Sequence, residues 1–307
     1  MTASDTAVAA PITLARPRAS ARGIMLCLVS AAGFGVAPVF AKEVYRAGVN
    51  VTTMLSVRFL IAAVIFWAVV AWRRPQLPPR RILLACLGLG AVGYALQAAL
   101  YFGAVARIDA SLAALLLYIY PAIVTLLAVA LRRERTDRRR LVALTSSAAG
   151  LVLLLGTRGA APATASIGVA LALGAAVAYA LYLTVADGVL PHLDVFLLSA
   201  LVCSAAAISV AGVGLTTGAL RAPEVAVGWL WIGLLAVVST VLPVATLFAG
   251  IRVVGAPTAA ILSCVEPAVT VAVTAPLYGE TLSAGQAVGG ALVLAAVVVL
   301  QVRPRRR

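Results

Sequence analysis

The sequence predicts an all-α polytopic membrane protein whose ten transmembrane helices form two five-helix repeats of inverted topology around a central cavity. Three observations predict this class: an apolar composition, ten long apolar runs and an internal repeat. Of the 307 residues, 63% are hydrophobic and only 11% are charged, whereas a soluble domain is about 45–50% apolar and about 25% charged. Such a chain cannot cover its apolar side chains with polar surface, so a lipid bilayer is its expected solvent.

Ten apolar runs approach the length of about 20 residues that a helix needs to cross a bilayer. They do not alternate between apolar and polar residues, so they favour helices over the strands of a membrane barrel. In chain order the runs are 23–41, 51–71, 82–105, 110–131, 141–156, 167–186, 193–214, 227–249, 254–277 and 284–302. The first run lacks a convincing cleavage site, so we expect it to be a transmembrane helix and not a signal peptide.

An internal repeat divides these runs into two sets of five. When the chain is shifted by 146 residues, the following residues coincide without a gap: Phe102 with Phe248, Ala110 with Ala256, Pro121 with Pro267, and Glu134 with Glu280. Because five is an odd number, the second set enters the bilayer upside down, an arrangement typical of transporters with a substrate site near the midplane. Glu134 and Glu280 are expected to lie near the N-termini of the helices that follow them, where the helix dipole favours a carboxylate.

The predicted domains follow from this repeat and from the charged ends. They are a cytoplasmic N-terminal tail (1–21), a first five-helix repeat (22–157), a linker (158–165), a second, inverted repeat (166–302) and a basic C-terminal tail (303–307).

The net charge of +14 is distributed unevenly between the loops of the two sides. One side carries 18 basic residues: Arg16, Arg18, Arg22, Arg73, Arg74, Arg80, Arg81, Arg132, Arg133, Arg135, Arg138, Arg139, Arg140, Arg252, Arg303, Arg305, Arg306 and Arg307. The other side carries five: Lys42, Arg46, Arg107, Arg158 and Arg221. The positive-inside rule therefore predicts that both termini are cytoplasmic. No basic patch is interleaved with stacking aromatic residues, so we expect no nucleic-acid partner.

Prolines and one acidic residue inside the runs suggest the transport site. Four prolines are expected to kink their helices, because proline removes a backbone donor: Pro38, Pro121, Pro243 and Pro267. Glu266 lies eleven residues, or roughly 16 Å, into its run. An ionised carboxylate at that depth usually faces a bundle interior or water, so proton coupling is one option. The alternative is a neutral glutamate that only bonds to neighbouring backbone.

Further candidates for the walls of the cavity are aromatic or polar. The full set is Phe34, Arg58, Tyr94, Gln97, Tyr101, Tyr118, Tyr120, Tyr179, Tyr182, Ser239, Thr246, Ser263, Glu266 and Thr270. Tyrosines suit a wet pocket for an amphiphilic guest, although hydrogen bonds between helices are an alternative role. Arg58 either extends outward to the lipid headgroups or faces the cavity, as a partner for Glu266 or for a substrate carboxylate. Lys42 is expected at the membrane interface.

Two stretches carry a resemblance to a known family. They are ASLAALLLYIYPAIVTLLAVALRRE (110–134) and APTAAILSCVEPAVTVAVTAPLYGE (256–280). Together with Arg58–Phe59 and Glu266–Pro267, they resemble the EamA family of the drug/metabolite transporter superfamily. The resemblance implies an inner-membrane exporter of amino acids, related metabolites or small toxic compounds, with an inverted-repeat bundle around a central cavity. One departure is Phe34, which stands where the family often has tryptophan.

We therefore expect a secondary active transporter that exports small metabolites, above all amino acids or similar amphiphilic compounds, by alternating access. The alternatives are a multidrug or toxic-cation exporter, an importer of the same fold, and a non-transporting membrane sensor or partner subunit. The sequence contains no HExxH, GxSxG, Walker loop or Cys/His cluster, so we expect no enzyme activity, no cofactor and no metal. The expected location is the bacterial inner membrane, the expected partners are a small-molecule substrate and lipid, and a monomer is the simplest assembly.

Overall fold

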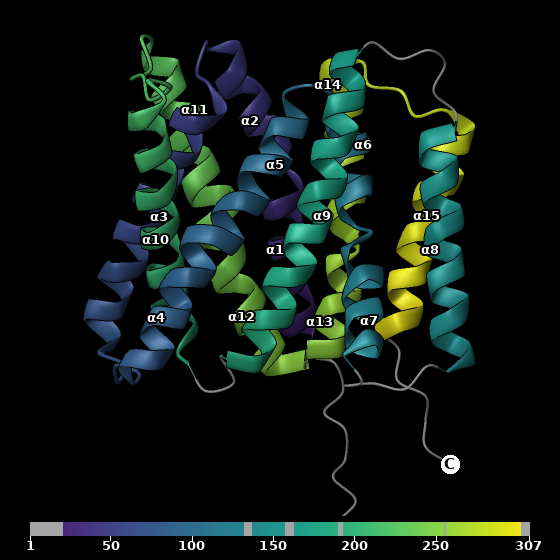
Figure 1. Cartoon of the computed structure of the whole chain (residues 1–307), viewed down its shortest axis with the longest axis horizontal. Helices are drawn as coiled ribbons and strands as arrows, with labels where there is room; N and C mark the ends of the chain where they lie inside the picture. Colours follow the sequence, from purple (N-terminus) through teal and green to yellow (C-terminus); the bar gives the residue numbers. More distant parts are fainter. Residues whose placement is uncertain (1–20, 132–136, 157–162, 190–192, 255, 302–307) are drawn as a thin grey trace, which may run out of the picture.

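The computed structural model describes residues 21–131, 137–156, 163–189, 193–254 and 256–301, and every regular element in these ranges is helical. The elements are α1 (Ala21–Gly35), α2 (Ala37–Arg46), α3 (Val51–Arg73), α4 (Arg80–Gly88), η1 (Leu89–Tyr94), α5 (Ala95–Val105), α6 (Ala110–Leu117), α7 (Tyr120–Ala130), α8 (Arg138–Gly156), α9 (Ala163–Val189), α10 (Val195–Thr216), α11 (Ala226–Ala236), η2 (Val237–Val241), α12 (Leu242–Val254), α13 (Ala256–Ser263), α14 (Val265–Tyr278) and α15 (Ala284–Gln301). They form one upright bundle (Figure 1).

These elements combine into ten spans that confirm the predicted fold class. Within the described residues, nine helical stretches are long and apolar enough to cross a membrane, and the apolar stretch Ala284–Leu300 is slightly shorter. Each stretch coincides closely with one of the ten apolar runs. Large apolar side chains such as Leu60 and Ile208 are 57% and 74% exposed, as expected for a surface that faces lipid.

Five of the spans are interrupted at or near mid-length. Three are broken into two helices each: α1 and α2, α6 and α7, and α13 and α14. Two contain a short π-helical segment instead, η1 between α4 and α5, and η2 between α11 and α12. A shift of 146 residues places the range of α6 on the range of α13, so the breaks repeat with the sequence.

The four prolines that were expected to kink helices lie just after these interruptions. Pro38 is the second residue of α2, Pro121 is the second residue of α7, and Pro267 is the third residue of α14. Pro243 is the second residue of α12, directly after η2. Proline is tolerated in the first turn of a helix, where its missing N–H group would have had no partner. Each broken span is therefore two shorter helices with a joint between them.

Helices of the two halves pack against each other in pairs, notably α3 with α10, α1 with α12, α5 with α9 and α8 with α15. Gly150 of α8 and Gly289 of α15 allow the last pair to approach closely. A Cβ atom built on either glycine would lie 2.6 or 2.7 Å from the carbonyl oxygen of the other. Because lipid provides no hydrophobic drive for helix association, such close van der Waals contact is a main source of stability.

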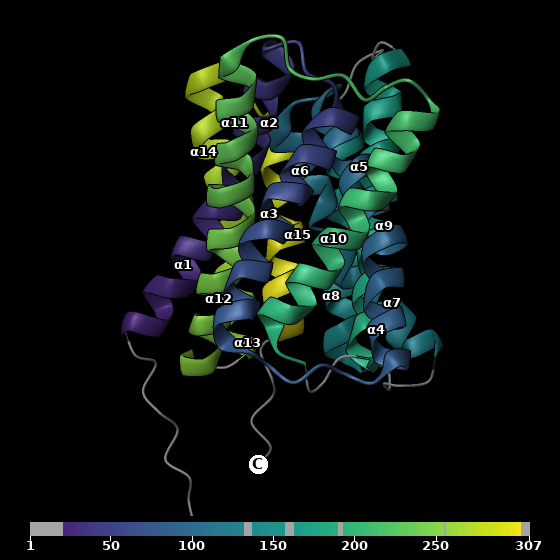
Figure 2. The same cartoon turned by 90° about the vertical axis from the view of Figure 1, so that its left-hand side faces the viewer.

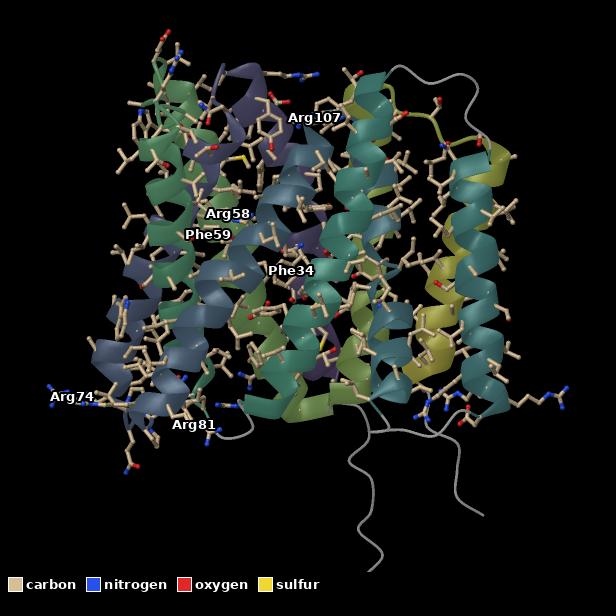
Figure 3. The ribbon with its side chains drawn as sticks, in the orientation of Figure 1. Phe34, Arg58, Phe59, Arg74, Arg81 and Arg107 are labelled. Carbon is tan, nitrogen blue, oxygen red and sulfur yellow. The ribbon has the colours of Figure 1, made fainter. Side chains whose placement is uncertain are left out.

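The bundle has two distinct ends. We call the end where α1 begins and α15 ends the terminal face, and the other end the opposite face (Figures 1 and 2). Figure 3 shows Arg74 and Arg81 at the terminal face, Arg107 at the opposite face and Arg58 about midway. Arg74 and Arg81 therefore lie on a different face from Arg107, as the charge count requires.

Candidate transport site

A cavity lies near mid-height, where Figure 3 places Phe34. The residues that line it are Phe34, Ala37, Tyr94, Gln97, Tyr101, Leu117, Tyr118, Tyr120, Tyr179 and Glu266. Eight of the ten belong to the set predicted from the sequence; Ala37 and Leu117 were not predicted. Water-sized molecules have about 120 Å³ of free space inside it, which is room for several waters, since one needs roughly 10–15 Å³.

Three helix breaks meet at this cavity. Gly35 ends α1, and a Cβ atom built on it would lie 2.7 Å from the carbonyl oxygen of Glu266, so only glycine fits against α14 here. The Thr270 hydroxyl donates to the Gly35 carbonyl over 2.7 Å. Tyr118 follows the last residue of α6 and reaches across to the break between α13 and α14. The cavity therefore lies where three spans can bend.

Glu266 and Tyr118 are the central polar pair of the cavity. The Tyr118 hydroxyl lies 2.8 Å from Oε2 of Glu266 and 2.7 Å from the carbonyl oxygen of Ser263. Tyr118 itself is buried, and Glu266 is partly exposed toward the cavity. A carboxyl group with one phenol partner and access to the cavity can exchange a proton or bind a cationic group.

A ladder of tyrosines forms one wall of the cavity. The rings of Tyr120 and Tyr179 meet edge to face with centroids 4.6 Å apart, and Tyr179 stacks on Tyr182 at 6.2 Å. Tyr182 continues to Tyr94 at 6.1 Å. Tyr182 is thus behind the lining residues and supports them. Aromatic faces of this kind bind apolar and cationic groups.

Arg58 occupies neither of the two places considered for it from the sequence. Its side chain is buried, with the residue 4% exposed, so it does not extend to the headgroups, and it is not among the residues that line the cavity. Its Nε donates to the Thr240 hydroxyl over 2.8 Å, and its guanidinium lies over the Phe102 ring, 4.9 Å from the centroid. No cationic side chain is therefore found among the described residues that line the cavity.

Four other predicted residues also lie outside the lining set. Ser263 and Thr246 donate to backbone carbonyls of their own helical stretches, and Thr270 holds Gly35. Ser239 is fully buried in η2, and its hydroxyl has no hydrogen-bond partner within the described residues. No residue of the α11–η2–α12 span lines the cavity, although the sequence stripe of Ser239 and Thr246 had suggested one.

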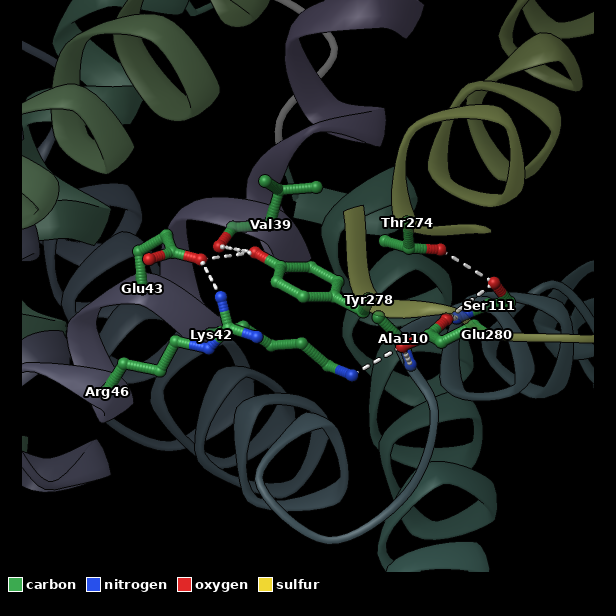
Figure 4. A network of polar contacts seen from close by, with 9 residues as sticks. All are labelled: Val39, Lys42, Glu43, Arg46, Ala110, Ser111, Thr274, Tyr278 and Glu280. Carbon is green, nitrogen blue, oxygen red and sulfur yellow. Dashed lines mark hydrogen bonds and ion pairs between the residues drawn. The ribbon is translucent and has the colours of Figure 1, made fainter. Parts of the chain in front are cut away.

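A polar network closes the bundle at the opposite face (Figure 4). The carboxylate of Glu280 forms an ion pair with Lys42 of α2. It also accepts hydrogen bonds from the backbone N–H groups of Ala110 and Ser111, at 2.9 and 3.0 Å, and from the Ser111 hydroxyl at 2.7 Å. Thr274 of α14 lies 2.8 Å from the same hydroxyl. Glu280 therefore ties the end of α14 to α2 and to the start of α6.

The position of Glu280 corrects one expectation. Its carboxylate caps the N-terminus of α6, not of the α15 helix that follows it in sequence. Lys42, which was expected at the membrane interface, pairs with Glu280 near this end of the bundle. Burial alone would raise the pKa of Glu280, but the hydrogen bonds from Lys42, Ser111 and Ala110 outweigh it and lower the pKa to about 2. Glu134, its equivalent in the repeat, lies outside the described residues.

A second set of contacts surrounds this network. Tyr278 donates to Glu43 over 2.8 Å, and Glu43 also accepts from Arg46 over 2.8 Å. Lys42 and Arg46 both lie over the Tyr278 ring, at 4.9 and 4.5 Å from its centroid. These contacts join α2 to the last turn of α14 a second time.

The broken spans pack differently at the two faces. At the opposite face α6 packs against α14, whereas at the terminal face no comparable packing joins the described parts of α7 and α13. Figure 2 shows α7 and α13 well separated. The two spans therefore meet at one end and diverge at the other.

A wider groove of about 470 Å³ between α3 and α10 is a poorer candidate site. Its walls are almost wholly apolar and include the exposed side chains of Leu60 and Ile208. Arg221 is the single ionisable residue among those that line it. In a bilayer this groove would face acyl chains.

Comparisons with known proteins identify a family and two relatives that are named as transporters. The model of the EamA-like transporter family matches residues 21–156 and 166–302. The uncharacterized transporter YcbK of Bacillus subtilis (strain 168) is 28% identical over 283 residues, which cover 89% of this chain and 90% of that protein. An uncharacterized transporter of Archaeoglobus fulgidus is 30% identical over 277 residues, covering 89% and 93%. A crystal structure that is 18% identical superposes with a TM-score of 0.64 over 91% of this chain and 96% of the other, and supports the fold alone.

Proposed function

Because the chain belongs to the EamA-like transporter family, we propose that it is a secondary active transporter that exports small amphiphilic amines by alternating access. Its cargo would combine a protonated nitrogen with an aromatic or aliphatic body. The observation that carries this proposal is the charge of the cavity. Among the described lining residues Glu266 has the single carboxyl group, no Lys, Arg or His is present, and five tyrosines surround the carboxyl group.

The charge of the cavity favours an amine over a zwitterion. A carboxylate cargo group needs a cationic or strongly hydrogen-bonding partner when water is removed. Arg58 was the residue considered from the sequence as a partner for a substrate carboxylate, but its guanidinium already contacts Thr240 and Phe102. An ammonium group, by contrast, would pair with Glu266 and lie against tyrosine faces, a contact worth about 0.5–2 kcal/mol for each ring.

Amino acids are the second candidate, and one observation supports them. The helices α2 and α14 both begin beside the cavity, with Ala37 and Glu266 among the lining residues. The N-terminal end of a half-helix carries partial positive charge and attracts carboxylates in other transporters. This attraction is weaker than that of a full cation, so we rank amino acids after amines.

In the proposed mechanism the joints of the three broken spans open one mouth of the cavity while the other is closed. The described conformation supports a state closed at the opposite face, where Glu280 binds Lys42 and the start of α6. With both termini in the cytoplasm of a bacterium, that face is extracytoplasmic. Cargo would enter from the cytoplasm, and a proton on Glu266 would replace it on the return. A monomer suffices for this cycle.

The test is transport by the purified full-length protein in liposomes. The probes are phenylethylamine and phenylalanine, which share an aromatic body and differ by the carboxylate. We expect exchange of labelled phenylethylamine and little exchange of phenylalanine. Glu266→Gln should reduce amine exchange by roughly tenfold or more, because a hydrogen bond to a charged group contributes about 1.5–3 kcal/mol.

Two results would overturn the proposal. Exchange of phenylalanine with no exchange of the amine would show that amino acids, the second candidate, are the cargo. No exchange of either compound, nor of a wider set of amines and amino acids, would favour the non-transporting sensor or partner subunit. Reversing the imposed proton gradient tests the direction, since an exporter should accumulate amine only on the side from which protons are drawn.

A further inference from the structure

The hydroxyl group of Tyr118 faces two acceptors with one hydrogen to donate. It lies 2.7 Å from the Ser263 carbonyl oxygen and 2.8 Å from Oε2 of Glu266. A phenol can donate once, and its oxygen can also accept. One hydrogen shared between both acceptors would give two weakened bonds, so both short contacts can be full hydrogen bonds at the same time only if Glu266 supplies a hydrogen of its own.

The Ser263 carbonyl depends on this phenol because of Pro267. In a continuous helix the carbonyl of residue 263 would accept from the N–H group of residue 267. Proline has no such group, so the carbonyl at the joint between α13 and α14 has lost its usual partner. Leaving a buried carbonyl without a partner costs about 1–3 kcal/mol.

The two protonation states of Glu266 give different hydrogen bonds at this joint. When Glu266 is protonated, its O–H donates to the Tyr118 oxygen, and Tyr118 donates to the Ser263 carbonyl, so every group is paired. When the proton leaves to cavity water, the Tyr118 hydroxyl turns to the carboxylate. The Ser263 carbonyl is then unpaired and must find water or a backbone donor, which requires the joint to move.

We propose that Tyr118 is a positioning residue that couples the protonation of Glu266 to the bend between α13 and α14. Tyr118 itself stands at the joint between α6 and α7, so one hydroxyl links the joints of two broken spans. The inference rests on the proposed function for the cargo that displaces the proton. The link between proton and bend needs no cargo.

Glu266 is the group whose gain or loss of a proton the coupling requires, since carboxyl groups ordinarily ionise at lower pH than the groups around it. The other titratable groups that face it are the Cys264 thiol and five phenols, those of Tyr94 in η1, Tyr101 on α5, Tyr118, Tyr120 on α7 and Tyr179 on α9. Phenols and thiols ordinarily ionise at about pH 10 and about pH 8.5. The residue that α1 contributes to the lining, Phe34, is not titratable, and Lys42 of α2 is paired with Glu280 at the opposite face.

The test measures the bend directly in the full-length protein in lipid nanodiscs. Spin labels at Thr258→Cys in α13 and Leu277→Cys near the end of α14, with the four native cysteines replaced, report the distance between the ends of the two helices. We expect its distribution to differ between about pH 4 and about pH 8, a range that includes the ordinary pKa of a carboxyl group and in which phenols stay protonated. The pH profile of amine exchange gives a second readout.

Tyr118→Phe should abolish the pH-dependent change in distance, and so should Glu266→Gln, whose amide can donate to Tyr118 at every pH. Pro267→Ala restores an N–H group for the Ser263 carbonyl and should abolish the change without altering the cavity wall. Tyr45→Phe is the matched control: it also loses a tyrosine bond to a backbone carbonyl, that of Phe102 at 2.9 Å, and should keep the change.

Two outcomes would overturn the inference: a wild-type distance that does not respond to pH, or a Tyr118→Phe protein that responds as the wild type does. If Tyr118→Phe fails to fold, Pro267→Ala provides the same test, and a pH response like that of the wild type in this variant would overturn the inference. If the distance responds as expected but no amine is exchanged, the proposed function fails and the coupling stands.

Discussion

Replacing Glu280 with glutamine should open the opposite face of the bundle. Glu280→Gln keeps the shape of the side chain and one acceptor oxygen, but it removes the charge that binds Lys42 and strengthens the bonds from Ala110 and Ser111. In the proposed cycle these groups, which belong to the ends of α14, α2 and α6, would part when this face opens. The substitution therefore weakens the closed state more than the open one.

The pKa of Glu280 sets the scale of this effect. A pKa of about 2, against about 4.3 for glutamate in water, corresponds to ~3 kcal/mol in favour of the ionised, paired form. If opening exposes Glu280 to water, the closed state loses at most this amount. Glutamine retains part of the bonding, so we expect ~2 kcal/mol, or about a thirtyfold shift of the equilibrium toward the open state.

Pulsed electron paramagnetic resonance can report this shift, because it measures the distance between two spin labels. Labels at Ala106 and Leu277, both exposed near the opposite face, should separate in Glu280→Gln. Labels at Leu131 and Val253, exposed near the terminal face, should approach each other, because alternating access closes one mouth as the other opens.

Glu43→Gln is the matched control for this measurement. Glu43 lies next to Lys42 in sequence and bonds to Arg46 and Tyr278, but its side chain is 23% exposed. Partly exposed pairs contribute about 0–1 kcal/mol, so its effect should be smaller. Unchanged distances in a folded Glu280→Gln protein, or equal shifts in both variants, would refute the idea that Glu280 holds this face closed.

Three further predictions concern pH and packing. Because the pKa of Glu280 is lowered, its contribution is complete above about pH 5 and declines only as the pH falls toward 2. In a Glu266→Gln background, where the acid of the cavity cannot titrate, the Ala106–Leu277 distance should therefore not change between about pH 7 and about pH 5, and a separation in that range would contradict the pairing. Gly289→Leu should force α15 away from Gly150 and lower thermal stability in detergent by several degrees, whereas the same change at the open position Gly233 should not. Thr240→Val should leave the buried Nε of Arg58 unpaired and destabilise the protein by about 1–3 kcal/mol, and Thr240→Ser should restore most of the loss in a chemical-unfolding titration.

The spans and their pairing into repeats could be predicted because hydrophobic run length and the 146-residue shift are properties of single stretches of chain. The cavity was predictable in part because a carboxyl group and tyrosines inside an apolar run are costly to expose to lipid and therefore tend to face a shared interior. Tyr94, Gln97 and Tyr101 recur on one helical face, and the structure places all three on the cavity wall.

The partners of Arg58 and Glu280 could not be predicted because they lie on distant segments. Thr240 is 182 residues from Arg58, and Ala110 is 170 residues from Glu280. Periodicity indicates which face of a helix a side chain occupies, but not which helix lies opposite. The π-helical segments η1 and η2 were also missed, since no single residue type marks them as proline marks a break.

The hydrogen bonds from Ser111 to Glu280 cannot be formed at the equivalent position of the other repeat. Under the 146-residue shift Ser111 becomes Pro257, which offers neither an amide hydrogen nor a hydroxyl. The two repeats have the same architecture but are therefore chemically unequal at their ends, so the conformation closed at the opposite face and its inverted counterpart need not be equally populated. We expect the unloaded protein to favour closure at the opposite face, because Pro257 cannot donate the two hydrogen bonds that Ser111 donates to Glu280.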